Sequence, residues 1–565
     1  MPVIDVNLED FRELLGREVE LEELREKMPM MGTSWEGESR EGFTIEVFPN
    51  RPDLLSIEGL ARAYASFTGE MVGLRKYRVS DSGYRVVVEE RVKEVRPYFV
   101  SAVVKGFEFT DSLIRSVIQM QEKLHITHGR RRRKVAIGLH DLDAIDFPVA
   151  YTTRHPEFQF RPLGERFEKT LREILVELPK GQEYSWVVEG FDEYPILVDE
   201  KGMVLSMPPI INSEHTRIDE ATTEVFIDIT GTDLKAIDEA LNIICTTLAD
   251  RGAEIYGVQN EYYDGGVLDT PDLTPGEMRL EVDYVNEMLG LDLDSVRVAE
   301  LLECMGHGFD EHEVESYGGV AYLPVRTPAY RTDIMHPIDL VEDVAIAYGY
   351  NRFEPRIPPI SSEAGEDPRE IFSRKLRNFM VGFGILEVVT FMMSNKDKLF
   401  KKMSLEDEPV AETSNPKMEA YTVLRNRLLP SLMEVLSYNK HHPYPQNLYE
   451  IDDVILLDSS TETGARSARR LAVTICHAKA NFSEIKALMD SLLQNLDVYT
   501  EVQASGWECF IEGRRFTAKA SEKPLCWGGE VKPEVLVEWD LQMPVAALEM
   551  DVDLLYSLIK RVRRG

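Results

Sequence analysis

An internal duplication constrains the fold of this chain more than any other feature of its 565 residues. A shift of 274 residues places the apolar positions of residues 8–16 on those of residues 282–290, and both stretches end in glycine. The same shift places residues 24–32 on 298–306; only Leu21 loses its apolar match, at Ser295. A register kept through two helical patterns predicts that one small structural unit occurs twice.

Each copy is expected to form two short amphipathic helices followed by a strand. This succession is typical of a small α+β unit of the winged-helix type. Such units often bind DNA through a basic second helix, but neither second helix here is basic. We therefore expect a packing or docking role for both copies.

After the second copy, the pattern predicts a strand and then a helix, with four carboxylates around the turn between them. Tyr322 to Val325 alternates like an edge strand that contains a proline. A helical period begins at Asp339 and stops at Gly349. The four carboxylates belong to Asp333, Asp339, Glu342 and Asp343, of which the last three share one helical face.

Spacing alone leaves two interpretations of this acidic turn open. In the first, Asp339 is an N-cap and Glu342 its capping-box partner, with Asp343 near the helix dipole; together they contribute about 1–2 kcal/mol. In the second, the carboxylates hold a hard cation such as Mg²⁺, which prefers oxygen ligands in octahedral geometry.

Two motifs resemble the β chain of phenylalanyl-tRNA synthetases. One is R-x-D-I followed by D-L-V-E-D-V-A-x-x-Y-G-Y-N, at residues 331–351, and the other is N-R-P-D-x-L-S-x-x-G-x-A-R, at residues 50–62. The resemblance is to the archaeal and eukaryotic type, because the chain lacks the length for the oligonucleotide-binding insertion of the bacterial form. It implies that the Mg²⁺ ligands are Asp333, Asp339, Glu342 and Asp343.

Residues 85–268 alternate between strand-like and helix-like patterns, which predicts a mixed α/β domain. Strands are expected at 98–104 and 134–141, and a helix at 113–124. Polar residues 212–217 follow a Pro-Pro pair, and an apolar run then leads into Asp228. No Ser-His-Asp or Cys-His arrangement is evident, and His215 is expected to be merely exposed. The residues alone indicate a ligand-binding domain.

The same family resemblance implies that this is an editing domain, which hydrolyses tyrosine wrongly attached to tRNA(Phe). A buried acceptor would bind the tyrosyl hydroxyl and would be left unpaired by phenylalanine. The implied acceptor is Asp228, with Ser206 and Asn212 as polar liners or water holders and Leu197 as a pocket wall. Hydrolysis there needs a positioned water rather than an enzyme nucleophile. The alternative is that Asp228 only caps a turn.

Residues 359–565 are expected to form an antiparallel α/β domain. Helices are predicted at 371–383, within 415–440 and at 482–496, and strands at 386–393, 448–457 and 470–479. The motif N-P-x-x-x-x-Y-x-V-L-R-x-x-L-L-P-x-L at residues 415–432 matches the same β-chain family, which implies a class II synthetase-like fold.

This C-terminal domain is predicted to be catalytically silent and to form part of the interface with an active α chain. A working class II site needs an arginine on the motif-two strand and a glycine-rich, arginine-ended third motif, because positive clamps hold the nucleotide phosphates. Residues 447–451 contain no arginine, and none follows Gly528-Gly529-Glu530.

Composition limits the kinds of partner. A net charge of −35 repels phosphate, so any RNA contact is expected to be local or shared with another chain. The basic run at 130–134 is either a solvated face or such a contact. No apolar run could span a bilayer, no signal core begins the chain, and its five cysteines form no CxxC pair. We expect a cytoplasmic protein.

These inferences combine into an α+β multidomain chain. Its expected domains are a winged-helix-like unit (1–84), an editing and tRNA-binding domain (85–268), a metal-binding repeat of the first unit (269–358) and an inactive class II core (359–565). The resemblance implies an α₂β₂ phenylalanine–tRNA ligase whose α chain binds ATP and phenylalanine. The rivals are a self-sufficient synthetase, disfavoured by the missing arginines, and a non-catalytic nucleic-acid-binding scaffold.

Overall fold

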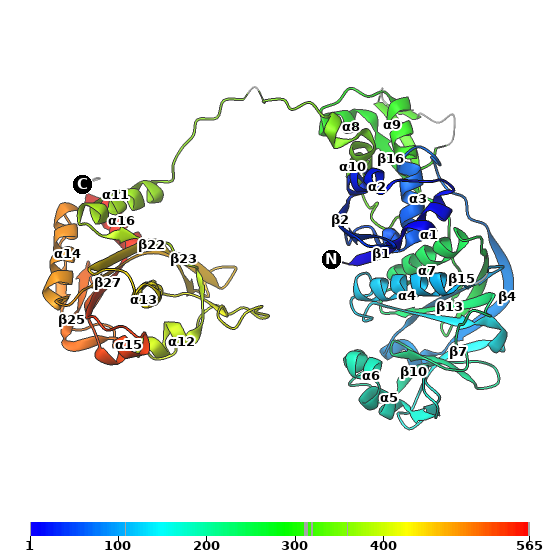
Figure 1. Cartoon of the computed structure of the whole chain (residues 1–565), viewed down its shortest axis with the longest axis horizontal. Helices are drawn as coiled ribbons and strands as arrows, with labels where there is room; N and C mark the ends of the chain where they lie inside the picture. Colours follow the sequence, from blue (N-terminus) through cyan, green and yellow to red (C-terminus); the bar gives the residue numbers. More distant parts are fainter. Residues whose placement is uncertain (1, 108, 310–314, 318–319, 359, 563–565) are drawn as a thin grey trace. The chain divides into compact units, whose positions relative to one another are not determined.

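The protein forms two units, Met1–Ile357 and Pro358–Gly565. The computed structural model describes residues 2–107, 109–309, 315–317, 320–358 and 360–562 (Figure 1). The division falls within a stretch, residues 354–358 and 360–367, that contains no helix or strand.

A ten-stranded mixed sheet is the largest element of the first unit. Its order is β12-β11-β10-β7-β4-β14-β5-β13-β6, with β15 paired to β14. Strand β4 runs parallel to both β7 and β14, and the other pairs are antiparallel. The strands are β4 (Val79–Val88), β5 (Tyr98–Lys105), β6 (Val135–Asp141), β7 (Val149–Arg154), β10 (Tyr194–Val198), β11 (Val204–Met207), β12 (Ile211–Asn212), β13 (Glu224–Gly231), β14 (Glu254–Tyr262) and β15 (Val267–Thr270).

Helices α4 (Asp111–Ile126) and α7 (Leu234–Ala249) pack on this sheet over β5, β6 and β13 (Figure 1). Their apolar faces close a core with the alternate side chains of the strands, such as Val100, Ile137 and Ile229. The expected mixed architecture is confirmed, and so are the strands at 98–104 and 134–141 and the helix at 113–124.

The two repeated units have the same element order. The first comprises β1 (Val3–Asn7), α1 (Leu8–Leu15), α2 (Leu21–Lys27), β2 (Thr33–Glu38), β3 (Gly42–Val47) and α3 (Ile57–Phe67); the second comprises β16 (Gly276–Glu281), α8 (Val282–Leu289), α9 (Ser295–Glu303), β17 (Glu315–Tyr317), β18 (Val320–Thr327) and α10 (Pro337–Tyr348). Their sheets have matching orders, β1-β3-β2 and β16-β18-β17. The sequence pattern missed the strand that opens each unit.

The duplication extends beyond the stretch found from the sequence. With a shift of 280 instead of 274, Arg51 falls on Arg331, Asp53 on Asp333, and the start of α3 on the start of α10. Each arginine grips the aspartate two residues later through two hydrogen bonds of 2.8 and 2.9 Å. The second copy has six additional residues before the turn, so a comparison without gaps does not detect this equivalence.

Two local expectations in the second repeat were wrong. Pro324 lies on β18, which is the central strand rather than an edge; among the described residues, β17 pairs with residues 320–322 of β18, so none of these pairs involves the proline. The N-cap of α10 is His336, and Asp339 is its capping-box partner at N3, so the cap lies one turn earlier than predicted.

The second unit is built on a seven-stranded sheet of order β19-β22-β23-β27-β26-β25-β24, antiparallel except for the β19–β22 pair. Its strands are β19 (Leu386–Glu387), β22 (Gln446–Leu457), β23 (Ala465–Cys476), β24 (Glu501–Gln503), β25 (Phe510–Ala520), β26 (Lys523–Val531) and β27 (Val545–Asp551). The helices α11 (Pro368–Gly382), α13 (Leu429–Tyr438) and α14 (Phe482–Asn495) confirm the three that the pattern predicted.

The single strand expected over residues 386–393 is wrong. The segment forms only β19 and, after a break, the first residue of β20 (Met393–Ser394). Its apolar side chains face outward, with Leu386, Val389 and Phe391 exposed to 66%, 84% and 76%. A continuous strand was predicted from the β-branched and aromatic composition, but these three side chains belong to none of the apolar cores formed by the described residues of this unit.

Candidate functional site

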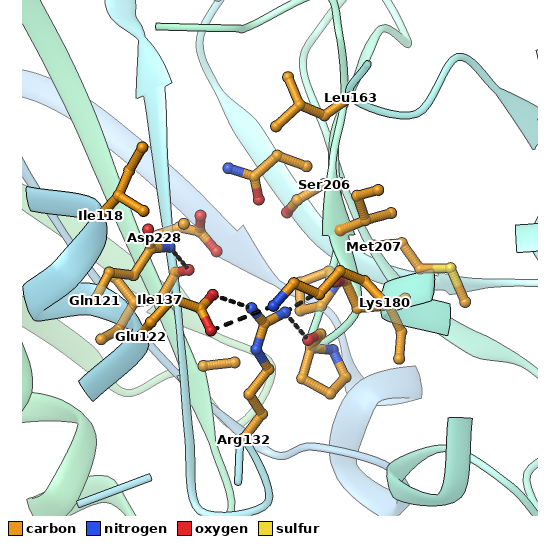
Figure 2. Close-up of a pocket in the computed structure, with 17 residues that line it drawn as sticks. Ile118, Gln121, Glu122, Arg132, Ile137, Leu163, Lys180, Ser206, Met207 and Asp228 are labelled. Atoms are coloured by element: carbon orange, nitrogen blue, oxygen red, sulfur yellow. Dashed lines mark hydrogen bonds and ion pairs between the residues drawn. The ribbon is translucent and has the colours of Figure 1, made fainter. Parts of the chain in front are cut away.

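A hollow of about 350 Å³ is lined by α4 and by strands from both ends of the large sheet, β6 and β13 from one end and β11 and β12 from the other (Figure 2). Its volume is in the range of small-molecule sites. Polar groups from six separate segments line it, and apolar side chains complete its wall. The lining includes Ile118, Gln121, Glu122, Arg132, Ile137, Gly138, Leu163, Lys180, Ser206, Met207, Asn212 and Asp228.

Asp228 lies in the middle of β13, between β5 and β6, and is 2% exposed. Its neighbour on β6 is Gly138, where an added Cβ would come within 1.9 Å of the Asp228 Oδ1 atom. Glycine is therefore required there for the carboxylate to occupy its position. The alternative that Asp228 merely caps a turn is wrong, because strand β13 continues to Gly231.

Asp228 belongs to a buried chain of three polar groups. The His140 Nε2 atom lies 2.7 Å from the Asp228 Oδ1 atom, and the His140 Nδ1 atom lies 2.8 Å from the Thr216 Oγ1 atom. If the ring donates to the carboxylate through Nε2, Nδ1 must accept the threonine proton. The chain then orients a carboxylate acceptor at the wall of the hollow.

Three of the four predicted editing residues line the hollow. Ser206 on β11 pairs with Asn212 on β12, and both line the hollow beside Asp228. The Ser206 hydroxyl is buried and has no hydrogen-bond partner among the described residues, whereas the Asn212 amide donates to the carbonyl of Leu139 at 3.2 Å. Leu197 lies opposite Ser206 in register but belongs to the apolar core rather than to the lining.

Arg132 forms a charged wall of the hollow. Its guanidinium donates to the carbonyls of Pro209 and Ile210 at 3.1 and 2.9 Å and to the Glu122 carboxylate at 2.8 Å (Figure 2). Lys180 contacts the other Glu122 oxygen at 3.3 Å. The wall thus has two cations beside one carboxylate, which suits an anionic or strongly polar ligand.

His125 supports this wall from below, on α4. Its Nε2 atom accepts the backbone N–H of Ile137 at 2.8 Å, so the ring is neutral with its proton on Nδ1. Burial lowers the pKa of His125 to about 4. The histidine therefore fixes α4 to β6 without adding charge below the hollow.

A second hollow of about 380 Å³ adjoins the first. The two share Ile118, Gln121, Leu163 and Asn212 in their linings. Phe109, Leu139 and Ile218 make the second hollow largely apolar, and the buried Thr216 reaches it. A ligand with a polar head and a flat apolar or aromatic group can occupy both.

The four carboxylates of the acidic turn do not converge on one point. Arg331 binds both oxygens of Asp333 and also binds Asp343, which lies 2.6 Å from the His307 Nε2 atom. Asp339 accepts the backbone N–H groups of Met335 and His336, and Glu342 is exposed. Each acid thus has a separate partner or faces solvent.

As placed, these residues do not fit a Mg²⁺ ion, although their oxygens are the right donors. Burial alone would raise the pKa of Asp343, but Arg331 and His307 outweigh it and lower that pKa to about 2. Within the described ranges, no three side chains of His, Cys, Asp or Glu are gathered as a metal site. Mg²⁺ at Asp333, Asp339, Glu342 and Asp343 stays a prediction from the resemblance.

Family models match most of the chain. A B3/4 domain covers residues 109–246, a tRNA synthetase B5 domain covers 278–350, and the phenylalanyl-tRNA synthetase β-chain CLM domain covers 354–552. The phenylalanine–tRNA ligase β subunit of Archaeoglobus fulgidus is 41% identical over 560 residues, which span 99% of each chain. The chain belongs to the phenylalanine–tRNA ligase β-subunit family.

The β subunit of Pyrococcus abyssi is likewise 41% identical, over 99% of this chain and all of its own. An N-terminal fragment of the Pyrococcus horikoshii β subunit, solved as a crystal structure, matches 61% of this chain and 99% of its own with 42% identity and a TM-score of 0.58. The resemblance predicted from the motifs is therefore confirmed. As a phenylalanine–tRNA ligase β subunit, this chain serves an aminoacyl-tRNA synthetase of protein biosynthesis.

Sequence reasoning missed several groups of the site in this β subunit. His140 and Gly138 lie two residues apart on β6 and therefore on the same face of the sheet. The strand predicted from the sequence could have placed them together on this basis. Arg132 was noticed only as part of a basic run. Glu122 and Gln121 looked like the polar face of an amphipathic helix, and only the fold brings them to Asp228.

Within the described part of the chain, no helix is long and apolar enough to cross a membrane.

Proposed function

We propose that the hollow at Asp228 is an editing site that hydrolyses tyrosine from tRNA(Phe), while the ligase complex joins phenylalanine to the same tRNA. The observation that carries this proposal is the buried Asp228 carboxylate, held by His140 at the wall of a tyrosine-sized hollow. A carboxylate there accepts the tyrosyl hydroxyl. Phenylalanine would leave it buried and unpaired, which disfavours the cognate ester.

Ser206 and Asn212 are the polar groups best placed to hold the attacking water or the ester. The Ser206 hydroxyl has no other partner within the described residues. Arg132 and Lys180 line the same wall, where positive charge would stabilise the oxyanion that forms when water adds to the ester carbonyl. The adjoining apolar hollow suits the terminal nucleoside to which the amino acid is attached.

The test is hydrolysis of tyrosyl-tRNA(Phe) by the complex with its α subunit, comparing the wild type with Asp228→Ala. We expect deacylation to fall by about 10²–10³-fold, the scale of a lost polar group in a hydrolytic site, with phenylalanylation intact. Unchanged deacylation would remove Asp228 from the site and leave the family assignment standing.

We further propose that the second unit is a catalytically silent, class II-like core that binds the α subunit. Its buried arginines already have carboxylate partners: Arg425 binds Glu450 and Asp452, and Arg469 binds Asp453. The Gly528-Gly529 pair is filled by packing, since an added Cβ at Gly528 would come 2.7 Å from the Phe516 ring. These features leave no free clamp for ATP phosphates on this part of the sheet.

The outward-facing apolar segment of this unit is the proposed α-subunit contact. Leu386, Val389 and Phe391 are exposed, and Phe391 borders an apolar hollow with Met418 and Tyr421. Exposed apolar patches of this kind mark protein interfaces. A Val389→Asp variant is expected to fail to co-purify with the α subunit, whereas Ile360→Asp, at an exposed position outside this segment, should still do so.

The remaining proposals concern assembly, cellular location and the domains of the chain. An α₂β₂ complex would bind ATP and phenylalanine on its α subunits and work in the cytoplasm, where tRNA is charged. The matching three-stranded sheets and helices of the repeated units support a winged-helix-like origin for both. Their roles are structural, because Arg51 and Arg331 hold carboxylates of their own units. The domain limits 1–84, 85–268, 269–358 and 359–565 also remain proposals.

A further inference from the structure

The turn that places Arg132 in the hollow has an unusual backbone. Arg130, Arg131 and Arg132 are consecutive and all have positive φ, of 47°, 56° and 62°. The backbone of residues other than glycine rarely adopts this left-handed region, and three such residues in a row are rarer still. Strain of this kind, in a chain with many glycines, points to a function for the side chains that it displays.

The backbone of this turn has a clear structural role, but the exposed side chains of Arg130 and Arg131 do not. Its N–H groups bind carbonyls at the end of α4, including Arg131 N–H to Ile126 at 3.4 Å and Arg132 N–H to His125 at 3.0 Å. A helix end of this type is normally closed by glycine or asparagine. The helix cap therefore does not explain why arginines occupy it.

Three exposed arginines flank the buried one in the sequence. Arg130, Arg131 and Arg133 are exposed, and within the described residues none of these side chains has a hydrogen bond or ion pair. The chain has 99 acidic and 64 basic side chains, so three adjacent unpaired cations are not expected by chance. They neighbour Arg132, which lines the hollow.

We propose that this arginine turn, residues 130–133, binds the backbone phosphates of the single-stranded 3′ end of the tRNA whose ester enters the hollow. Arg132 faces the ester, and the three exposed arginines meet the phosphates that precede it. This inference rests on the proposed editing function. It also explains how a chain with a net charge of −35 can hold a polyanion at one place.

The test uses the full β chain in complex with its α subunit and an Arg130→Gly/Arg131→Gly/Arg133→Ala variant. Glycine adopts positive φ without a Cβ clash, so the thermal midpoint should hold or rise. The kcat/KM for tyrosyl-tRNA(Phe) should fall about tenfold at low salt through KM. Loss of three phosphate contacts to a single strand should reduce the slope of log affinity against log salt concentration by about 2. Between 50 and 200 mM salt, the affinity of the wild type should therefore fall about 20-fold more than that of the variant.

Two comparisons make the result specific. Hydrolysis of the tyrosyl ester of adenosine, which has no phosphate, should be unchanged in the variant. A control that removes three exposed cations elsewhere in the first unit, Arg40→Ala/Lys76→Ala/Arg356→Ala, changes net charge equally and should leave kcat/KM nearly unchanged.

Three outcomes would overturn the inference: no change with tyrosyl-tRNA(Phe), an equal loss with the adenosine ester, or an equal loss in the control. If the wild type hydrolysed neither ester, the proposed editing function itself would fail, and this inference with it.

Discussion

Two buried histidine–aspartate pairs in the first unit have nearly the same geometry and different surroundings. His140 lies 2.7 Å from Asp228, and His307 lies 2.6 Å from Asp343. Asp228 borders a hollow of about 350 Å³, whereas Asp343 is closed in by Arg331 at 2.8 Å. A buried carboxylate with free space beside it can recognise a ligand, and one that also binds a guanidinium group is a structural counter-ion.

The largest expected effect separates the two aspartates by stability. Asp343→Asn leaves Arg331 and His307 without their shared carboxylate, and breaking such a buried pair costs about 3–5 kcal/mol. Asp228→Asn keeps its place beside one histidine and should cost about 1–3 kcal/mol, the scale of one disturbed buried hydrogen bond. Urea denaturation of both variants measures the difference. Equal losses would contradict the division into a ligand site and a structural pair.

A third buried histidine, His125, sharpens the comparison through pH: its Nδ1 atom lies 3.8 Å from the Glu122 carboxylate, farther than a hydrogen bond. Burial lowers its pKa from 6.5 to about 4, so the unfolded chain binds this proton more tightly. Its contribution to stability is therefore complete above about pH 6.5 and is lost as pH falls through 4. The change amounts to about 3 kcal/mol.

The measurement is the free energy of unfolding from pH 7 to 4 for the wild type and His125→Asn, whose amide oxygen can still accept the Ile137 N–H. The variant should lack this part of the pH dependence. His215→Asn is the control, because His215 is exposed. The same pH curve for the wild type and His125→Asn would refute a neutral buried His125.

A smaller effect on stability is expected for substitution of Ser206, which lines the hollow with Asp228. Its buried hydroxyl has no partner in the part of the chain that the structure describes, so Ser206→Ala should change the free energy of unfolding by about 1 kcal/mol or less and can raise it. Deacylation of tyrosyl-tRNA(Phe) should nevertheless fall by about tenfold or more. A stability loss without a change in hydrolysis would show that Ser206 serves packing.

The smallest expected effect is that of magnesium on the acidic turn that contains Asp343. With Asp333 and Asp343 bound to Arg331, millimolar Mg²⁺ should shift the thermal midpoint of the β chain by about 1 °C or less, and chelation should shift it as little. Differential scanning calorimetry with Mg²⁺ and with EDTA measures this. A clear Mg²⁺-dependent rise that Glu342→Gln abolishes would support the ligand set implied by the resemblance instead.

Local signals predicted much of this fold because they depend on near neighbours. Helices α1 and α8 end at Gly16 and Gly290, and Gly32 and Gly306 close the short turns that follow α2 and α9; all four glycines have left-handed φ. Apolar periods also gave the helices at 371–383 and 482–496. Composition failed at residues 386–393, where apolar side chains are exposed, because a sequence pattern does not say what covers a surface.

The sequence by itself determined the duplicated unit, the family and three of the residues that line the hollow. Only the tertiary structure decided which side chains meet: His140 contacts Thr216 and Asp228 across separations of 76 and 88 residues, and Arg331 binds two of the acids expected to hold a metal. Helical periods and caps are set by residues three or four apart. Strand order and buried charge pairing depend on long-range contacts, which one sequence does not reveal.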